Sequence, residues 1–214
     1  MAERVGLFGG SFNPVHNGHL IVARAVAEYV GLTRVVLLPS ARPPHKDSTR
    51  LLDGAHRYAM LQRAVDGDPL FAVNDVDLRR PGPCYTIDTV AILTEQLGGG
   101  IELCWLIGSD SLADLPTWHR AAELVDACRI LTAVRRGWDD VSWKELEGAF
   151  GGGRTNRLRD GLVPSPMIDI SSTEVRLRLA SGRSVRYLIP DAVADYVQQH
   201  GLYGSAASPS KRQR

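Results

Sequence analysis

The stretch GLFGGSFNPVHNGHL, residues 6–20, joins an apolar run, two adjacent glycines and two histidines in one short segment. The apolar run over residues 4–8 predicts a strand, and the amphipathic spacing from Gly18 through Tyr29 predicts a helix. Between them, Gly9 and Gly10 lack a Cβ atom, so the backbone can approach a ligand closely. We therefore expect a strand–loop–helix unit whose first helical N–H groups face an anion.

The rest of the chain alternates short apolar runs with helix-length amphipathic segments. Apolar runs predict strands at residues 34–39, 71–76, 101–108, 129–134 and 167–170. Helical spacing predicts helices at residues 54–65, 85–97, 118–127, 142–150, 172–182 and 191–200. This alternation is typical of an α/β fold of the Rossmann-like, doubly wound type, a parallel sheet with helices on both faces. Ligands of such sheets bind beyond the carboxyl ends of the strands.

The composition of the 214-residue chain excludes some classes of partner. A formal net charge of +1 gives no general attraction to nucleic acid or membranes, so phosphate recognition must come from local groups. No apolar stretch approaches the roughly 20 residues of a membrane span. Cys84, Cys104 and Cys128 form no closely spaced pair, which favours reduced thiols. We expect a cytoplasmic protein without nucleic-acid or membrane partners, and the sequence leaves a homo-oligomer open.

His16 and His19 stand three residues apart at the expected helix start, so both imidazoles can lie on one side of its first turn. With the helix N-terminus they suit a phosphate, although a glycine turn with surface histidines is the alternative. The glycine order does not match the G-x-G-x-x-G fingerprint of dinucleotide binding, and no further Cys or His completes a zinc site. GAFGGGRT, residues 148–155, lacks the lysine and the preceding strand of a P-loop, so we expect a flexible surface loop there.

A second helix start is predicted at ISSTEVR, residues 170–176, where Ser171 and Glu174 have the spacing of a capping box. Its hydroxyl groups, with Arg176 one turn later, suit a second anion site. A well-capped helix with a solvated arginine is the alternative. Both predicted helix starts follow a strand of the same sheet, and this favours the anion site over a helix that is only well capped.

These two stretches carry a family resemblance. The first resembles the G-G-[ST]-F-[DN]-P-x-H-x-G-H signature of nucleotidylyltransferases, with Ser11 and Asn13 where Thr and Asp are commoner, and ISSTEVR resembles their second phosphate-binding motif. PPHK, CYTIDT, LIGSDSLADLPTWH and SVRYLIPDAVADYVQQHGLY make the chain similar to bacterial nicotinate-nucleotide adenylyltransferases, in order from Val5 to Tyr203. Residues 138–166 match least, so no site is assigned there.

The resemblance implies an HxGH-type nucleotidyltransferase domain over residues 1–204, with the C-terminal helical part, residues 171–204, integral to it. We expect a disordered tail over residues 205–214 from its small, polar and basic composition. The family transfers the adenylyl group of ATP to nicotinate mononucleotide, forming deamido-NAD and pyrophosphate. The phosphate of the mononucleotide would attack the α-phosphorus in line, without a covalent intermediate. Mg²⁺ is expected with ATP, and the sequence shows no dedicated protein metal site.

The resemblance also implies roles for single residues. His16 and His19 would contact the ATP phosphates, with His19 stabilising the transition state. The other residues implied to bind ATP are Gly9, Gly10, Ser11, Phe12, Lys46, Gly108, Asp110, Ser171, Thr173 and Arg176. Asp110 would accept hydrogen bonds from the ribose, or act as a helix cap. Lys46 with His45 would bring positive charge, and an ordinary solvated loop is the alternative reading of both.

The mononucleotide is implied to bind at His45, Thr86 and Trp118. An indole suits stacking on a flat ring, and Thr86 at a helix start can help to bind a carboxylate. Without the resemblance, a core tryptophan and a helix-capping threonine would be favoured.

Rival hypotheses remain. N–H donors at a helix start favour the acid, but nicotinamide mononucleotide, or both mononucleotides, stays an alternative acceptor. Phosphopantetheine is disfavoured by the YTIDT and LPTWH pair. A non-catalytic nucleotide sensor should have lost a phosphate-handling residue, yet all four of them are present, namely His16, His19, Lys46 and Arg176.

Overall fold

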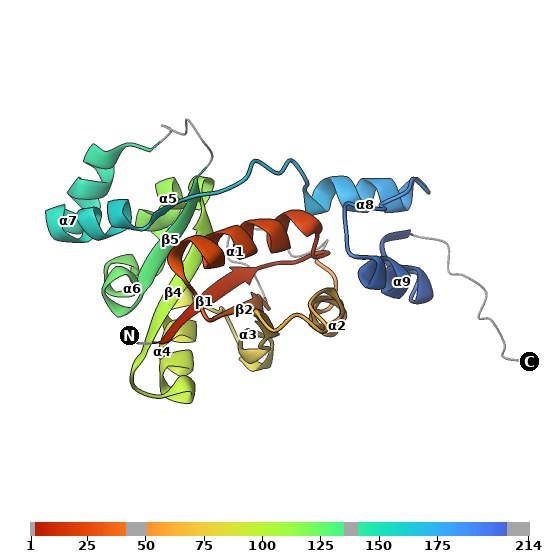
Figure 1. Ribbon diagram of the computed structural model, residues 1–214, viewed down its shortest axis with the longest axis horizontal. Helices are drawn as coiled ribbons and strands as arrows, with labels where there is room; N and C mark the ends of the chain where they lie inside the picture. Colours follow the sequence, from red (N-terminus) through yellow and green to blue (C-terminus); the bar gives the residue numbers. More distant parts are fainter. Residues whose placement is uncertain (1–2, 42–50, 135–140, 205–214) are drawn as a thin grey trace, which may run out of the picture.

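The computed structural model describes residues 3–41, 51–134 and 141–204 (Figure 1). Six strands form one parallel sheet in the order β3-β2-β1-β4-β5-β6. They are β1 (Glu3–Gly10), β2 (Arg34–Pro39), β3 (Phe71–Val73), β4 (Ile101–Gly108), β5 (Arg129–Val134) and β6 (Leu162–Pro164). This strand order is that of a doubly wound Rossmann-like sheet, so the predicted fold class is confirmed.

The helices cover both faces of the sheet. They are α1 (Asn17–Val30), α2 (Gly54–Ala64), α3 (Val76–Arg79), α4 (Thr86–Leu97), α5 (Ser109–Asp114), α6 (Ala121–Ala127), α7 (Trp143–Asp160), α8 (Ser172–Ala180) and α9 (Asp191–Gln199), with the 3-10 turns η2 (Leu115–Thr117) and η3 (Leu202–Gly204). Residues of α1, α2, α8 and α9 share one apolar core with the sheet. Residues of α4, α5, α6 and α7 share the other.

The alternation of side chains along each strand produces these two cores. In β2, Leu37 belongs to the core beneath α1 and Leu38 to the core beneath α4. In β4, Leu106 belongs to the core beneath α1 and Trp105 to the core beneath α4. Because each strand is buried on both faces, it reads in the sequence as a continuous apolar run, as expected of a parallel sheet.

The strand order reverses beside β1, which pairs with β2 on one side and β4 on the other. The crossover through α1 runs from β1 to β2, whereas the chain enters β4 only after β3 and α4. The loops that leave β1 and β4 therefore diverge at their carboxyl ends. In doubly wound sheets this divergence opens a crevice for ligands.

Three expectations about elements are wrong. Residues 167–170 are not a strand; the last strand is β6, and Ile168 instead packs over the start of α1, where its Cγ2 atom lies 3.1 Å from the position of a Cβ built on Gly18. Residues 148–155 are not a surface loop but part of α7, which kinks at Gly151 with φ 75°. Thr155 is buried there and its hydroxyl donates to Gly151 O at 2.9 Å. The third error is the strand at 71–76, which ends at Val73 because the chain turns into α3 at Val76.

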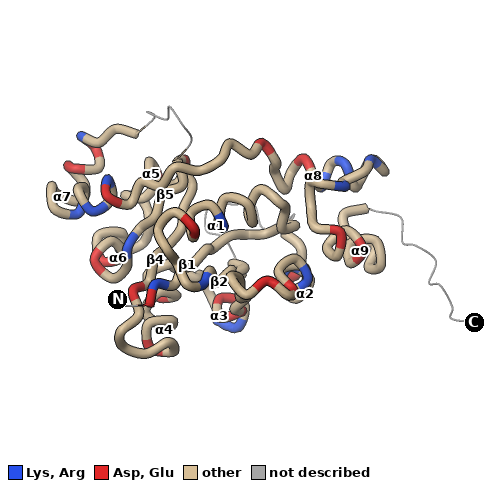
Figure 2. The backbone as a smooth tube through the Cα atoms, in the orientation of Figure 1, with Lys and Arg blue, Asp and Glu red and all other residues tan. Residues whose placement is uncertain are grey.

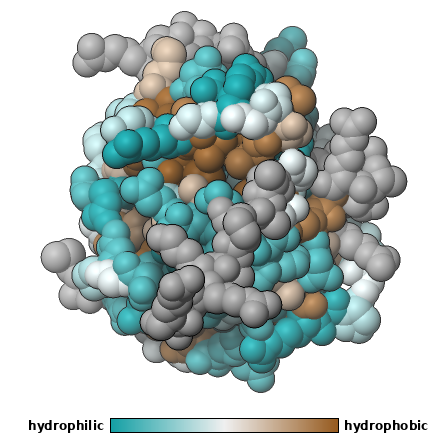
Figure 3. Space-filling view, turned by 90° about the vertical axis from the view of Figure 1, so that its right-hand side faces the viewer, coloured by the Kyte–Doolittle hydropathy of each residue, from teal (hydrophilic) through white to brown (hydrophobic). Residues whose placement is uncertain are grey.

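The outer surface shows little segregation of charge. Figure 2 shows Lys and Arg interspersed with Asp and Glu along α7 and α8. Figure 3 views the end that carries α8 and α9, where apolar groups lie among hydrophilic ones; Leu177 in α8 and Tyr187 after it are exposed. Within the described residues, no helix is long and apolar enough to span a membrane. The expected tail, residues 205–214, lies outside them.

Candidate functional site

Two cavities lie at the carboxyl edge of the sheet, where the strand order reverses; the larger adjoins α4 and the smaller adjoins α1. The larger has a volume of about 490 Å³ and the smaller about 150 Å³. Both are lined by Phe8 at the end of β1 and by Leu106, Ile107 and Gly108 at the end of β4. The two cavities therefore adjoin, which suits two substrates that meet above these strands.

The loop after β1 is held by hydrogen bonds to its backbone carbonyl groups. Arg57 of α2, fully buried, donates to Ser11 O at 2.8 Å. Arg176 of α8 donates to Asn13 O at 2.8 Å, and Ser172 donates to Pro14 O at 2.9 Å. Because these carbonyls point toward α2 and α8, two helices far apart in sequence fix one loop.

His16 and His19 are brought together, as predicted. Their rings stack with centroids 3.6 Å apart and planes at 27°. The backbone N–H of His16 donates to His19 Nδ1 at 3.2 Å, which places the ring proton of a neutral His19 on Nε2. The Phe12 ring contacts His19 edge-on with centroids 5.0 Å apart. Stacking and hydrogen bonding thus fix the plane of the His19 imidazole beside the smaller cavity, which both histidines line.

His16 is the buried member of the pair, with 7% of its surface exposed. Burial lowers its pKa to about 4, because the charged imidazolium loses its hydration. His16 is therefore neutral near pH 7. Its Nδ1 atom has no hydrogen-bond partner among the described residues, so a polar atom is available at the start of α1.

The second helix start is a capped helix, as predicted from its capping-box spacing. Ser171 is the N-cap of α8 and its hydroxyl accepts from the Glu174 N–H at 3.1 Å. Arg176 Nη2 donates to the Thr173 hydroxyl at 3.2 Å, while Nη1 holds the β1 loop. Ser171, Thr173 and Arg176 do not line either cavity. Arg176 joins this helix start to the loop between β1 and α1, residues 11–16, which we call the histidine loop, by its hydrogen bond to Asn13 O.

Several aromatic side chains form part of the wall of the larger cavity. Thr86 opens α4 and Trp118 follows η2, and both line this cavity together with Gly9, Gly10 and Ser11. Tyr85 and His119, next to them in sequence, stack with ring centroids 4.0 Å apart. The cavity thus combines flat apolar surface with the N-terminus of α4, as a charged aromatic ligand requires.

Asp110 lies in the first turn of α5, whose N-cap is Gly108. Its Oδ1 atom lies only 2.6 Å from the position of a Cβ atom built on Gly108, so a side chain there would displace the carboxylate. Asp110 is exposed, and its carboxylate lies in the first turn of α5, where the helix N-terminus favours negative charge. His45 and Lys46 lie outside the described residues.

Sequence reasoning missed several residues that shape the site. Arg57 gave no signal, because a buried arginine in an amphipathic helix reads like a solvated one. Trp105 was read only as part of a buried strand, yet it lines the larger cavity and lies 2.6 Å from the position of a Cβ atom built on Gly9. Tyr85 and His119 belong to the CYTIDT and LPTWH motifs, but no role was predicted for either residue.

The arrangement of donor atoms bears on metal binding. Among the residues that the structure describes, no group of three or more His, Cys, Asp or Glu side chains is arranged to hold a metal ion. We therefore assign no protein ligand to a metal. Phosphate oxygens and water, the usual ligands of Mg²⁺ on a nucleotide, would have to provide most of its coordination.

Comparisons with known proteins agree with this geometry. The family described as "Cytidylyltransferase-like" matches residues 7–178. A protein of Thermomicrobium roseum named "Probable nicotinate-nucleotide adenylyltransferase" is 44% identical over 201 residues, covering 94% of this chain and 92% of its own. A Neisseria meningitidis serogroup B protein of the same name is 44% identical over 206 residues, covering 94% and 98%. In fold, the chain is similar to the Plasmodium falciparum nicotinic acid mononucleotide adenylyltransferase complexed with NaAD, at TM-score 0.73 and 18% identity, covering 96% and 100%.

Proposed function

Because this chain belongs to the cytidylyltransferase-like family and, within it, to the nicotinate-nucleotide adenylyltransferases, we propose that it transfers the adenylyl group of ATP to nicotinate mononucleotide. The products are deamido-NAD and pyrophosphate, so the enzyme is a nucleotidyltransferase of NAD biosynthesis. The observation that carries the proposal is the pair of adjoining cavities, with stacked histidines lining one and Thr86 and Trp118 lining the other.

The reaction we propose is a direct displacement at phosphorus. A phosphate oxygen of the mononucleotide bonds to the α-phosphorus of ATP, and the bond from that phosphorus to the bridging oxygen breaks as pyrophosphate leaves. No enzyme nucleophile is needed, so the protein contributes positioning and charge stabilisation. Its two cavities position one substrate on each side of the β1 and β4 ends.

His19 is the donor that we assign to the transition state. With Nδ1 accepting from the His16 N–H, a neutral His19 presents its N–H at Nε2. That group can stabilise the charge that develops on the phosphate oxygens during transfer. Neutral His16, stacked on His19, would contact the phosphates from the start of α1 without adding an unbalanced buried charge.

The other ATP contacts that we propose come from both sides of the crevice. Gly9, Gly10, Ser11 and Phe12 would offer backbone groups from the β1 loop, and Lys46 would approach from its loop. Ser171, Thr173 and Arg176 would hold the phosphates from α8, supported by the contact of Arg176 with Asn13. Gly108 and Asp110 would bind the ribose, since Gly108 lines both cavities and the exposed Asp110 follows it in the first turn of α5.

The mononucleotide would occupy the larger cavity, with His45 approaching from its loop. Trp118 offers the stacking surface for the pyridine ring, and Thr86 opens the helix whose N-terminus can bind a carboxylate. Mg²⁺ would neutralise charge on the ATP phosphates. Phosphate oxygens and water would provide most of its coordination, since no group of three or more His, Cys, Asp or Glu side chains among the described residues is arranged to hold a metal ion.

We further propose that residues 1–204 act as one nucleotidyltransferase domain. The C-terminal part contributes to the same core as α1 and α2, and it holds the histidine loop through Ser172, Arg176 and Tyr203. A cytoplasmic location is supported by free thiols at Cys84, Cys104 and Cys128.

Labelled ATP tests this proposal. With ATP labelled on its α-phosphorus, Mg²⁺ and nicotinate mononucleotide, the label should appear in the dinucleotide and not in pyrophosphate. ATP made chiral at the α-phosphorus by sulfur substitution should give inverted configuration, as one in-line displacement requires. Retained configuration would mean two displacements and a covalent adenylyl-enzyme.

A further inference from the structure

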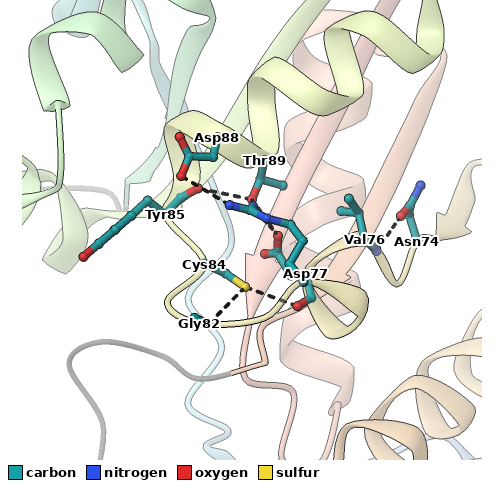
Figure 4. Close-up of polar contacts among 9 residues, drawn as sticks. Asn74, Val76, Asp77, Gly82, Cys84, Tyr85, Asp88 and Thr89 are labelled. Atoms are coloured by element: carbon teal, nitrogen blue, oxygen red, sulfur yellow. Dashed lines mark hydrogen bonds and ion pairs between the residues drawn. The ribbon is translucent and has the colours of Figure 1, made fainter.

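A part-buried ion pair joins Arg80 to Asp77, a residue in the wall of the larger cavity. Figure 4 shows Asp77 beside Thr89 and Asp88. Asp77 of α3 accepts from Arg80 Nη1 at 3.3 Å and from the Thr89 hydroxyl of α4 at 2.6 Å, both at Oδ1. The other terminal nitrogen of Arg80 lies 3.2 Å from Asp88 Oδ2. Arg80 therefore ties the end of α3 to the first turn of α4, the turn that carries Thr86.

Asp77 is part of the cavity wall. It is 7% exposed and lines the same cavity as Thr86 and Trp118. Burial raises the pKa of its carboxyl group, and the contacts with Thr89 and Arg80 oppose that rise by favouring the charged form. A carboxylate in this wall repels a negatively charged ligand unless a cation balances it.

Arg80 is the cation placed to do so. Of the described residues, Arg80 makes the ion pair with Asp77, and its side chain is 21% exposed. Arg120 also approaches the cluster, but at 3.8 Å from Asp88, and it is half-exposed and bound to Glu123. The balance of charge at the cavity wall therefore depends on Arg80.

We propose that the Arg80–Asp77 pair maintains the preference of this cavity for the acid over the amide form of the pyridine mononucleotide, a preference for which the N–H donors at the start of α4 provide the attraction. The inference rests on the proposed function, which it extends from substrate class to discrimination. By balancing Asp77, Arg80 removes a repulsion that falls on a carboxylate-bearing pyridine and leaves a neutral carboxamide unaffected. Arg80 acts through Asp77 and is a positioning residue rather than a catalytic one.

The test compares two acceptors in one assay. Arg80→Gln keeps a hydrogen-bond donor and removes the charge. It should lower kcat/KM for nicotinate mononucleotide about tenfold, mainly through KM, as expected for one uncompensated charge near a protein surface. For nicotinamide mononucleotide the change should stay below about threefold, because a neutral group feels little of that field.

A second substitution separates charge from structure. Adding Asp77→Asn to Arg80→Gln removes the repelling carboxylate, so acid efficiency should return to within about threefold of the starting protein. Arg80→Lys keeps the charge and should keep the acid preference. The matched control is Arg79→Gln, because Arg79 pairs with Asp75 away from the cavity and is 77% exposed. It should leave the ratio unchanged.

Several results would overturn the inference. An equal loss of kcat/KM for both mononucleotides in Arg80→Gln would mean that Arg80 only holds the end of α3 against α4. The same would follow if kcat/KM for the acid did not recover in the double variant. A folded Arg80→Lys protein without acid preference would exclude the charge argument. If the unaltered protein transferred adenylyl to neither mononucleotide, the proposed function itself would fail; calorimetric binding of the two mononucleotides to it and to Arg80→Gln would then judge the charge pair separately.

Discussion

The imidazole of His19 lies between two aromatic rings, stacked on His16 at 3.6 Å and touched edge-on by Phe12 at 5.0 Å. Its Nδ1 atom accepts from the backbone of His16, so the orientation and the tautomer of a neutral ring are set together. A hydrogen-bond donor that is fixed before the substrate arrives needs no reorganisation during the reaction. This pre-organisation underlies the role proposed for His19.

Replacing His19 tests that role. His19→Ala should lower kcat by about 10²–10³-fold, the usual loss for one transition-state donor. The fold should survive, as measured by circular dichroism and thermal unfolding. His200→Ala is the matched control, since His200 lies just after α9, outside both cavities. Near-normal turnover in His19→Ala would remove His19 from the chemistry.

Burial of His16 makes stability depend on pH. Its pKa of about 4 in the folded state is below its usual 6.5, so the unfolded chain binds more protons and the folded state loses stability as pH falls from about 6.5 to about 4. Between pH 7 and pH 5 this group should remove about 2 kcal/mol. His16→Gln should remove that dependence. Urea unfolding of both proteins at pH 7 and pH 5 measures the loss of unfolding free energy on acidification. An equal loss in the unaltered protein and in His16→Gln would contradict this role of His16.

Gly9 meets Trp105 too closely for a larger residue. A Cβ atom there would lie 2.6 Å from Cζ2 of the buried Trp105 side chain. Gly9→Ala should therefore destabilise the fold by about 1–3 kcal/mol through overpacking. The control is Gly99→Ala, where a Cβ atom meets nothing within 4 Å. If chemical denaturation gave the two variants equal stability, the close packing at the end of β1 would be disproved.

Trp118 is expected to act on one substrate only. Trp118→Ala should raise KM for nicotinate mononucleotide about tenfold, for loss of a stacking surface, and leave KM for ATP nearly unchanged. Trp143→Ala serves as the control, because Trp143 packs on Arg159 of the same helix, α7, and lines neither cavity. A parallel rise in both KM values would place Trp118 outside the pyridine site.

The sheet could be predicted because its strands carry their own signal. Buried parallel strands such as β4 are continuous apolar runs, and the amphipathic spacing of α1 is clear from the sequence. The pattern misled at Ile168 and Ile170, which are apolar because they cover the smaller cavity and not because they form a strand. Their burial depends on α1, which no local pattern reveals.

The residues of the site also divide into those that the sequence revealed and those that only the structure shows. The pair of His16 and His19 was found from local spacing, and Thr86 and Trp118 from the family resemblance; the structure places each beside a cavity. Arg57 and Asp77 were missed, because a buried charged residue has the same letter as a solvated one. Only the tertiary structure shows that Arg57 holds the carbonyl of Ser11 and that Asp77 lines the larger cavity.

Pyrophosphate release with ATP and Mg²⁺, measured with nicotinate mononucleotide and with nicotinamide mononucleotide as the acceptor, is the decisive test of the proposed reaction. We expect release with the acid at a kcat/KM well above that with the amide, because a carboxylate accepts hydrogen bonds from the N–H donors at the start of α4 and a carboxamide NH₂ group cannot. Equal efficiency with both would contradict the account of pyridine recognition. Release with neither would contradict the proposed reaction itself.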